Sequence, residues 1–246
     1  MKLESLRQTF LIISAVLIPV LLVFISPVVA LMAAADGTIA ACTIVLAVLY
    51  ILAIFLGRFW CGWLCPCGGM QDLIGMFSKK KAQRGTLDIL KVYVFIFWFG
   101  AIVLLYIFAG GIPSINPYYL LDNGINGLFP GMFYVSLIFI AILATITAIY
   151  GSRSFCRYIC PVGVLLNIGK KTGRKFGIPQ LGVAFHSRSC TNCGRCTQSC
   201  PMGVRVVKPD TFGTNSPNCI NCFVCCDACR TGSLKLEISR DWREKR

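Results

Sequence analysis

The residues with the clearest chemistry are eight cysteines in the C-terminal part of this 246-residue chain. They form two runs in which three cysteines follow one another at two-residue intervals and a fourth comes after three more residues. The first run is Cys190, Cys193, Cys196 and Cys200, and the second is Cys219, Cys222, Cys225 and Cys229. Three thiolates at this spacing wrap one iron–sulfur cubane, and two such runs are typical of proteins with two [4Fe–4S] clusters.

In this pattern the fourth cysteine of each run binds the cluster of the other run. We therefore predict one cluster on Cys190, Cys193, Cys196 and Cys229, and another on Cys219, Cys222, Cys225 and Cys200. The alternative is a pair of zinc sites, because closely spaced cysteine pairs also suit tetrahedral zinc. Two complete runs favour clusters. Two details depart from the pattern: Arg230 follows Cys229 where proline is usual, and Cys226 adds a spare thiol.

A second set of cysteines belongs to a motif that occurs twice. Residues 58–68 contain Cys61 and Cys65, and residues 153–163 contain Cys156 and Cys160. A shift of 95 residues superposes an arginine, both cysteines, the proline after the second cysteine, and a glycine. The repetition indicates a tandem duplication of two helices plus a C-x3-C-P motif, with both motifs on the same side.

These four cysteines are candidates for one shared redox or metal site. Within each motif the thiols lie four residues apart, which places them on one face if the helix continues. Pro66 and Pro161 disfavour helix at the cysteine before them, which predicts that the second thiol lies at a helix end. The alternative is that small cysteines only let the helices pack, since free cysteine is often buried apolar volume. Cys67 slightly favours a metal.

Four apolar runs without charged residues predict membrane spans. Each is close to the ~17–25 residues that cross a bilayer as a helix. They are Phe10–Met32, Ile39–Gly57, Val92–Ala109 and Met132–Tyr150. The predicted fold is thus an α-helical membrane protein with four transmembrane helices in a two-helix tandem repeat (residues 1–169), followed by a small α+β 2[4Fe–4S] ferredoxin domain (residues 170–246).

The distribution of charge predicts the orientation. All 24 Lys and Arg residues lie before the first span, between the second and third, or after the fourth. By the positive-inside rule, both termini and the ferredoxin domain face the cytoplasm of a multi-pass inner-membrane protein. The formal charge of +14 then needs no nucleic acid as a partner and fits anionic lipid near basic stretches such as Lys79–Lys81.

Several absences narrow the chemistry. The chain has one histidine, His186, outside the spans, which excludes a membrane haem with two histidine ligands and suggests a surface or packing role for this residue. No charged residue lies within a span, so a proton or ion path is not evident. Shorter stretches after each motif, Met70–Phe77 and Val164–Ile168, are amphipathic and suit the membrane interface or the start of a linker.

The spans, the paired C-x3-C-P motifs and the C-terminal double-cluster module together resemble the NapH-type membrane ferredoxins, the membrane components of quinol dehydrogenases. The same core is similar to nitrous-oxide-respiration regulators and to copper reductases that act in cytochrome oxidase assembly. The resemblance implies electron exchange between the quinone pool and a partner protein, as one subunit of a redox complex.

The leading prediction is therefore an electron-transfer subunit that uses [4Fe–4S] clusters and a quinone. The loop Gly111–Gly131 is aromatic, apolar and long, and is a candidate quinone site, with capping or subunit docking as the equal alternative. A metal-ion (copper) reductase or maturation factor is the second reading, with the membrane cysteines holding a soft ion such as Cu(I).

Overall fold

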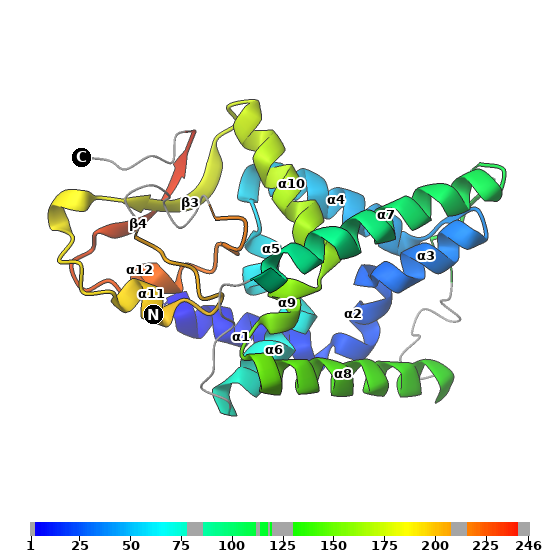
Figure 1. The fold of residues 1–246 in the computed structure, drawn as a ribbon, viewed down its shortest axis with the longest axis horizontal. Coiled ribbons are helices and arrows are strands. Elements are labelled where there is room, and N and C mark those ends of the chain that lie inside the picture. The colour runs from blue at the N-terminus through cyan, green and yellow to red at the C-terminus, as the bar shows by residue number, and fades with distance from the viewer. Residues whose placement is uncertain are drawn as a thin grey trace.

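The computed structural model describes residues 3–77, 86–111, 114–117, 119, 130–207 and 216–240. A group of helices makes up most of the molecule, and a small module with a two-stranded sheet lies at one end (Figure 1). The elements of the helical part are α1 (Leu3–Val16), α2 (Ile18–Ile25), α3 (Pro27–Ala35), β1 (Thr38–Ile39), α4 (Ala41–Leu56), α5 (Phe59–Trp63), α6 (Pro66–Phe77), η1 (Thr86–Ile89), α7 (Leu90–Phe108), β2 (Ser114–Ile115), α8 (Pro130–Tyr150), α9 (Ser154–Tyr158) and α10 (Pro161–Lys175). The module contains β3 (Gln180–Phe185), η3 (Ser187–Ser189), α11 (Arg195–Ser199), α12 (Val224–Asp227) and β4 (Leu234–Ser239).

The first predicted span, Phe10–Met32, is not one continuous helix. Helix α1 ends at Val16, and α2 and α3 follow in different directions (Figure 1). Both α2 and α3 carry a proline in their first turn, where the missing N–H costs nothing. At the second break the Ser26 hydroxyl accepts hydrogen bonds from the N–H groups of Val28 and Val29, so this side chain caps α3.

The other three predicted spans coincide with α4, α7 and α8. Within the described residues, one helical stretch is long and apolar enough by itself to cross a membrane: Leu87–Phe108, with a mean hydropathy of 2.2. Ala41–Leu56 and Leu137–Tyr150 are shorter apolar helices. The outward face of α7 is strongly apolar, since Phe97 is 78% exposed and Phe108 is 84% exposed.

The two repeated units pack across each other. Helices α5 and α9 begin 95 residues apart, at Phe59 and Ser154, and α6 and α10 begin at Pro66 and Pro161 with the same offset. Helix α6 packs against α1 and α8, whereas α10 packs against α4 and α7 (Figure 1). Each helix that follows a motif therefore contacts one long helix from its own unit and one from the other.

The C-terminal module is built on the antiparallel pair β3 and β4, which runs from the Gln180–Ser239 pair to the Phe185–Leu234 pair. A small apolar core fills the space beneath it. Its buried members are Trp63, Val183, Phe185, Val206, Phe223 and Leu234. One of them, Trp63, comes from α5, so the module is packed onto the helical part. Helix α10 runs on to Lys175, past residue 169, where we placed the domain boundary.

Candidate functional site

The eight cysteines of the module line two separate cavities. One cavity, of about 340 Å³, is lined by Cys190, Cys193, Cys196 and Cys229. A narrower one, of about 30 Å³, is lined by Cys200, Cys219, Cys222 and Cys225. Each cavity thus gathers three cysteines of one run and the fourth of the other, which is the grouping that crossed ligation requires. We call them the outer and the inner cysteine cavity.

The two cysteine loops share an unusual backbone. Asn192 and Asn221 occupy the same place in their runs, and both are left-handed, with φ of 52° and 50°. Two residues later Gly194 and Phe223 are left-handed as well, with φ of 72° and 60°. This geometry turns amides inward: the N–H of Asn192 lies 3.5 Å from the sulfur of Cys190. Amides that point at thiolate sulfur stabilise bound clusters.

A phenylalanine in the left-handed region is costly and needs compensation from its surroundings. The Phe223 side chain is 2% exposed. Its ring centroid lies 6.3 Å from those of both Phe59 and Trp63 in α5. Packing against the helical part therefore offsets the strain and fixes the loop of the inner cavity in place.

Hydrogen bonds hold the same loop against the motif helices. The indole N–H of Trp63 donates to the carbonyl of Asn221 at 3.1 Å. The side-chain amide of Asn221 donates to the carbonyls of Leu56 at 3.0 Å and Leu181 at 2.9 Å. A guanidinium nitrogen of Arg58 donates to the carbonyl of Pro217 at 2.7 Å. The inner cavity is thus docked directly on the first C-x3-C-P motif, a contact that sequence reasoning did not predict.

The four motif cysteines are electrostatic neighbours, with Cys61 and Cys156 buried and Cys65 and Cys160 half-buried. As predicted, the prolines interrupt the helices: α9 ends at Tyr158, and Cys160 is extended and occupies the position just before α10, without a side-chain capping hydrogen bond. Burial raises the pKa of Cys156, and the neighbouring charges of Cys65, Cys160 and Cys61 raise it further. Burial likewise raises the pKa of Cys160 to about 12, with Cys61 and Cys65 again contributing.

Cys65 behaves differently from its three neighbours. A hydrogen bond from the Cys67 thiol lowers the pKa of Cys65 to about 6, although burial acts against this. The pKa of Cys67 is raised in turn, first by this hydrogen bond and then by burial. A lowered pKa favours the thiolate of Cys65, which is the form that binds metal.

Gln71 is a site residue that sequence reasoning missed. This side chain is fully buried, and its amide nitrogen lies 3.0 Å from the sulfur of Cys156, to which it donates. Its amide oxygen accepts from the N–H of Phe155 at 3.0 Å. Helix α6 of the first unit thereby positions a cysteine of the second unit.

The arginine of each motif lies against the glycine of the motif in the other unit. A Cβ added at Gly68 would lie 2.9 Å from a guanidinium nitrogen of Arg153, and one added at Gly163 would lie 2.7 Å from a guanidinium nitrogen of Arg58. A larger residue at either glycine would displace the guanidinium of the other unit, so the crossed contacts account for the pairing of arginine and glycine in the duplicated motif.

The two arginines differ in how their charge is balanced. Arg153 forms a bidentate ion pair with Asp72, at 2.7 and 2.8 Å. Arg58 is 1% exposed, has no carboxylate partner among the described residues, and keeps its Nε without a hydrogen bond. Burial raises the pKa of Cys61, and the Arg58 charge acts in the opposite direction. Because a buried, unbalanced cation is costly, the Arg58 site suits an anionic group on the motif thiols.

The donor set fits iron–sulfur clusters in the module, since the linings of both cavities offer four soft thiols and contain no histidine or carboxylate. Across the described ranges, no three Cys, His, Asp or Glu side chains meet closely enough to hold a single metal ion. His186 lies 3.4 Å from the Glu237 carboxylate and lines neither cysteine cavity. Most of the candidate quinone loop Gly111–Gly131 lies outside the described residues.

Comparison with known proteins identifies iron–sulfur regions in both parts of the chain. A family described as "4Fe-4S binding domain" matches twice, over residues 38–84 and 132–179, which contain the second long helix and the motif of each repeated unit. A family described as "4Fe-4S dicluster domain" matches residues 182–230, the module with the two cysteine cavities. No solved structure matches the chain significantly.

Individual relatives are electron-transport and ferredoxin-type proteins. The chain is 25% identical to the putative electron transport protein YccM of Escherichia coli, over 79% of this chain and 55% of YccM. It is 30% identical to the methylamine utilization ferredoxin-type protein MauN of Methylorubrum extorquens, over 77% of this chain and 64% of MauN. It is 23% identical to the ferredoxin-type protein NapH of Haemophilus influenzae, over 77% and 65%. The chain thus spans between about half and two thirds of each relative.

Proposed function

Because this chain belongs with the 4Fe-4S ferredoxin-type electron-transport proteins that include NapH, MauN and YccM, we propose that it exchanges electrons between the quinone pool of a membrane and a redox partner protein. The observation that carries the proposal is the series of cysteines that begins with the buried Cys61 and Cys156 at the motif helices, continues through the half-buried cysteines of the inner cavity, and ends at the exposed Cys193. Electron transfer needs such a series of closely placed redox groups.

In this proposal two [4Fe–4S] clusters occupy the module. Cys190, Cys193, Cys196 and Cys229 hold one in the outer cavity, and Cys200, Cys219, Cys222 and Cys225 hold the other in the inner cavity. Each cluster, when bound, accepts and releases single electrons. The chain supplies the thiolates, the inward-facing amides and the apolar packing that excludes water around the inner cavity.

The four motif cysteines, Cys61, Cys65, Cys156 and Cys160, form a third redox or metal site in this proposal. Three features support it: the thiols are electrostatic neighbours, Arg58 is buried with no carboxylate partner among the described residues, and a "4Fe-4S binding domain" profile covers each motif. Cys61 and Cys160 pack in the same buried cluster as Cys200 and Cys222 of the inner cavity. The inner cavity therefore lies between the motif site and the outer cavity.

The membrane position is part of the proposal. The apolar outward face of α7 and the absence of Lys and Arg from the loops after the first and third predicted spans support a multi-pass arrangement with the ferredoxin module in the cytoplasm. Lipid and the other subunits of a redox complex are then its partners.

The alternative function is copper reduction or maturation by the same clusters, with the motif thiols holding Cu(I). Cys67 favours it, because this fifth thiol is half-buried and forms a hydrogen bond with Cys65.

Two measurements on anaerobically purified protein separate these functions. If the chain serves the quinone pool, a quinol or quinone analogue changes the redox state of the clusters, followed by their visible absorbance and by electron paramagnetic resonance. If it handles copper, copper co-purifies with the chain and is lost in a Cys67→Ser variant. If no quinone or quinol changes the redox state of the clusters, the first function is excluded.

A further inference from the structure

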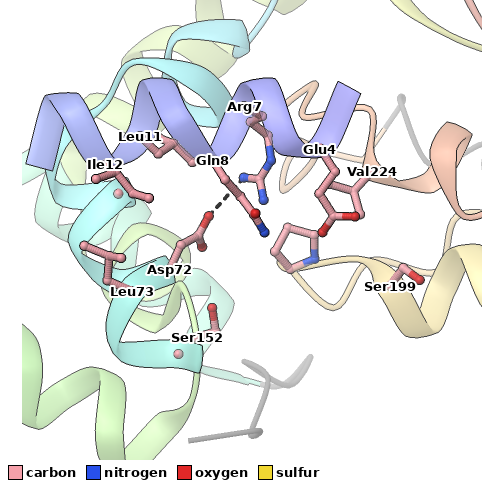
Figure 2. Close-up of a pocket in the computed structure, with 13 residues that line it drawn as sticks. Glu4, Arg7, Gln8, Leu11, Ile12, Asp72, Leu73, Ser152, Ser199 and Val224 are labelled. Atoms are coloured by element: carbon pink, nitrogen blue, oxygen red, sulfur yellow. Dashed lines mark hydrogen bonds and ion pairs between the residues drawn. The ribbon is translucent and has the colours of Figure 1, made fainter. Parts of the chain in front are cut away.

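A cavity of about 200 Å³ lies where α1, α6 and the ferredoxin module meet (Figure 2). One wall is α1, with Glu4, Gln8 and Ile12, and a second is α6, with Asp72 and Leu73. The third wall comes from the module, through Ser199, Pro201 and Val224. We call it the α1–α6 pocket. None of the predicted site residues lines it.

Hydrogen-bonding groups gather on the inner side of this pocket. Arg7 is 4% exposed, and its guanidinium donates to Asp72 at 2.9 Å, as Figure 2 shows. The Nε of Arg7 is buried and has no hydrogen-bond partner. The side chains of Gln8, Ser152 and Ser199 also reach the pocket and can donate. A ligand with carbonyl oxygens would find donors on more than one wall.

The charge of the pocket favours a neutral ligand over an anion. Glu4 and Asp72 line it, whereas Arg7 is the one guanidinium in the lining. Asp72 stays ionised: burial opposes this, but Arg153 and Arg7 outweigh burial and lower the pKa of Asp72. A phosphate or a lipid head group would therefore face two carboxylates against a single cation that is already paired.

The size and the apolar surface narrow the ligand further. The cavity is smaller than the ~300–1,000 Å³ of typical sites for drug-sized molecules, so it suits one substituted ring. Leu11, Ile12 and Leu73 make its wall apolar on the side of α1 and α6. On α1 the apolar surface continues outward, because Ile12 is 43% exposed and Val16 is 74% exposed. A long apolar tail attached to the ring could follow this surface.

The pocket also lies against the cysteines of the inner cavity. Ser199 and Pro201 flank Cys200, and Val224 precedes Cys225. Both cysteines line the inner cavity. On the opposite wall, Gly69 follows the Cys65–Cys67 segment of the first motif within α6. A redox-active ring in this pocket would lie between the motif site and the inner cavity.

We propose that the α1–α6 pocket binds the head group of a quinone, with its isoprenoid tail along the exposed apolar face of α1. This inference rests on the proposed function, and it names the pocket in which the quinone would react. Oxidation of one quinol to quinone releases two electrons and two protons. The clusters that the module and motif cysteines would hold would supply one-electron acceptors for these two electrons, and Glu4 at the pocket would carry the protons to water. The reverse reaction uses the same groups. Arg7 and Gln8 hold the carbonyl oxygens.

Two neighbouring isoleucines provide a matched test. Ile12 lines the pocket, whereas Ile13 does not and is 52% exposed on the same helix. We expect Ile12→Trp to fill the pocket and Ile13→Trp to leave it open. Gln8→Leu is a second variant, which removes one hydrogen-bond donor without a large change in volume.

The first readout is binding, and it does not depend on turnover. Full-length, cluster-loaded protein in lipid nanodiscs is labelled with a photoreactive azidoquinone, and the labelled peptides are identified by mass spectrometry. Label should appear on residues 3–16 and 66–77 in the parent and in Ile13→Trp, and should disappear from them in Ile12→Trp.

The second readout is the rate at which decylubiquinone reoxidises the reduced clusters, with ferricyanide as an oxidant that needs no pocket. Gln8→Leu should slow the quinone reaction about tenfold, the scale of one lost hydrogen bond. Ile12→Trp should slow it further, and the ferricyanide rates should not change. If the parent reacts with decylubiquinone but both variants match it, the quinone binds elsewhere and this inference is wrong. If the parent does not react at all, the proposed function itself is wrong.

Discussion

Cys200 and Cys229 are the residues that distinguish crossed from uncrossed ligation, because each lines the cavity of the other run. We predict that Cys200→Ala damages the cluster held by Cys219, Cys222 and Cys225, and leaves the outer cluster intact. Electron paramagnetic resonance of the reduced protein, together with iron analysis, measures this. Cys226→Ala is the matched control, since Cys226 lines neither cavity, and it should keep both clusters. Loss of the outer cluster in Cys200→Ala would contradict crossed ligation.

The cysteine sets could be predicted from sequence because thiol spacing within one loop is a local property. Gln71 and Arg58 could not be assigned roles in the same way. Gln71 reaches Cys156, which lies 85 residues later, and Arg58 contacts Gly163 in the other unit. Neither contact leaves a periodic signal in the chain. The repeat in the sequence showed that an arginine and a glycine recur in both motifs. The packing adds that the arginine of each motif contacts the glycine of the other.

At the scale of single elements, α5 makes the contact that joins the two parts of the molecule. A Cβ at Gly62 would lie 2.5 Å from the backbone oxygen of Ile220, in the loop of the inner cavity. Gly62→Ala should therefore push this loop away and destabilise the protein by about 1–3 kcal/mol, as overpacking usually does. The inner cluster should be lost before the outer one during heating, as followed by visible absorbance.

Gly100 provides the control for that substitution, because it is also helical and nothing lies within 4 Å of an added Cβ. Gly100→Ala should leave both clusters unchanged and stabilise α7 by roughly 0.5–1 kcal/mol through helix propensity. Equal loss of clusters in both variants would show that the Gly62 contact is not what fixes the inner loop.

Iron analysis tests whether the two motifs hold a third cluster. We predict about twelve irons per chain, four for each of three cubanes. Cys61→Ala and Cys156→Ala should each lower this to about eight. Cys42→Ala should not change it, because this buried cysteine lies in α4, outside both motifs. If the parent contains about eight irons and the two motif variants transfer electrons normally, the motif cysteines hold no cluster and serve only in packing.

The element bounds were predictable to different degrees. Three apolar runs became α4, α7 and α8, and the prolines after Cys65 and Cys160 start α6 and α10 as the N-terminal preference of proline implies. Apolar composition alone did not reveal that residues 10–32 form three helices. The breaks depend on proline and on the Ser26 cap, which act on backbone direction and leave mean hydropathy unchanged.

At the scale of the whole molecule, the placement of all 24 basic residues makes the orientation testable. Reporter fusions after Asp36 and Asp122 should report the outer side of the membrane, and a fusion after Lys80 should report the cytoplasm. Paired alkaline phosphatase and fluorescent protein reporters measure this. A cytoplasmic signal from the Asp122 fusion would contradict the four-span arrangement.

The crossed packing of the two units has a consequence for biogenesis. Arg58 is synthesised 105 residues before Gly163, and Cys61 is synthesised 95 residues before Cys156. While a ribosome is still making the second unit, the first unit has neither its packing partner nor half of its motif thiols. The inner cysteine loop comes later still and docks on both. Iron–sulfur assembly factors would therefore find a complete acceptor only after the last cysteine run has been synthesised.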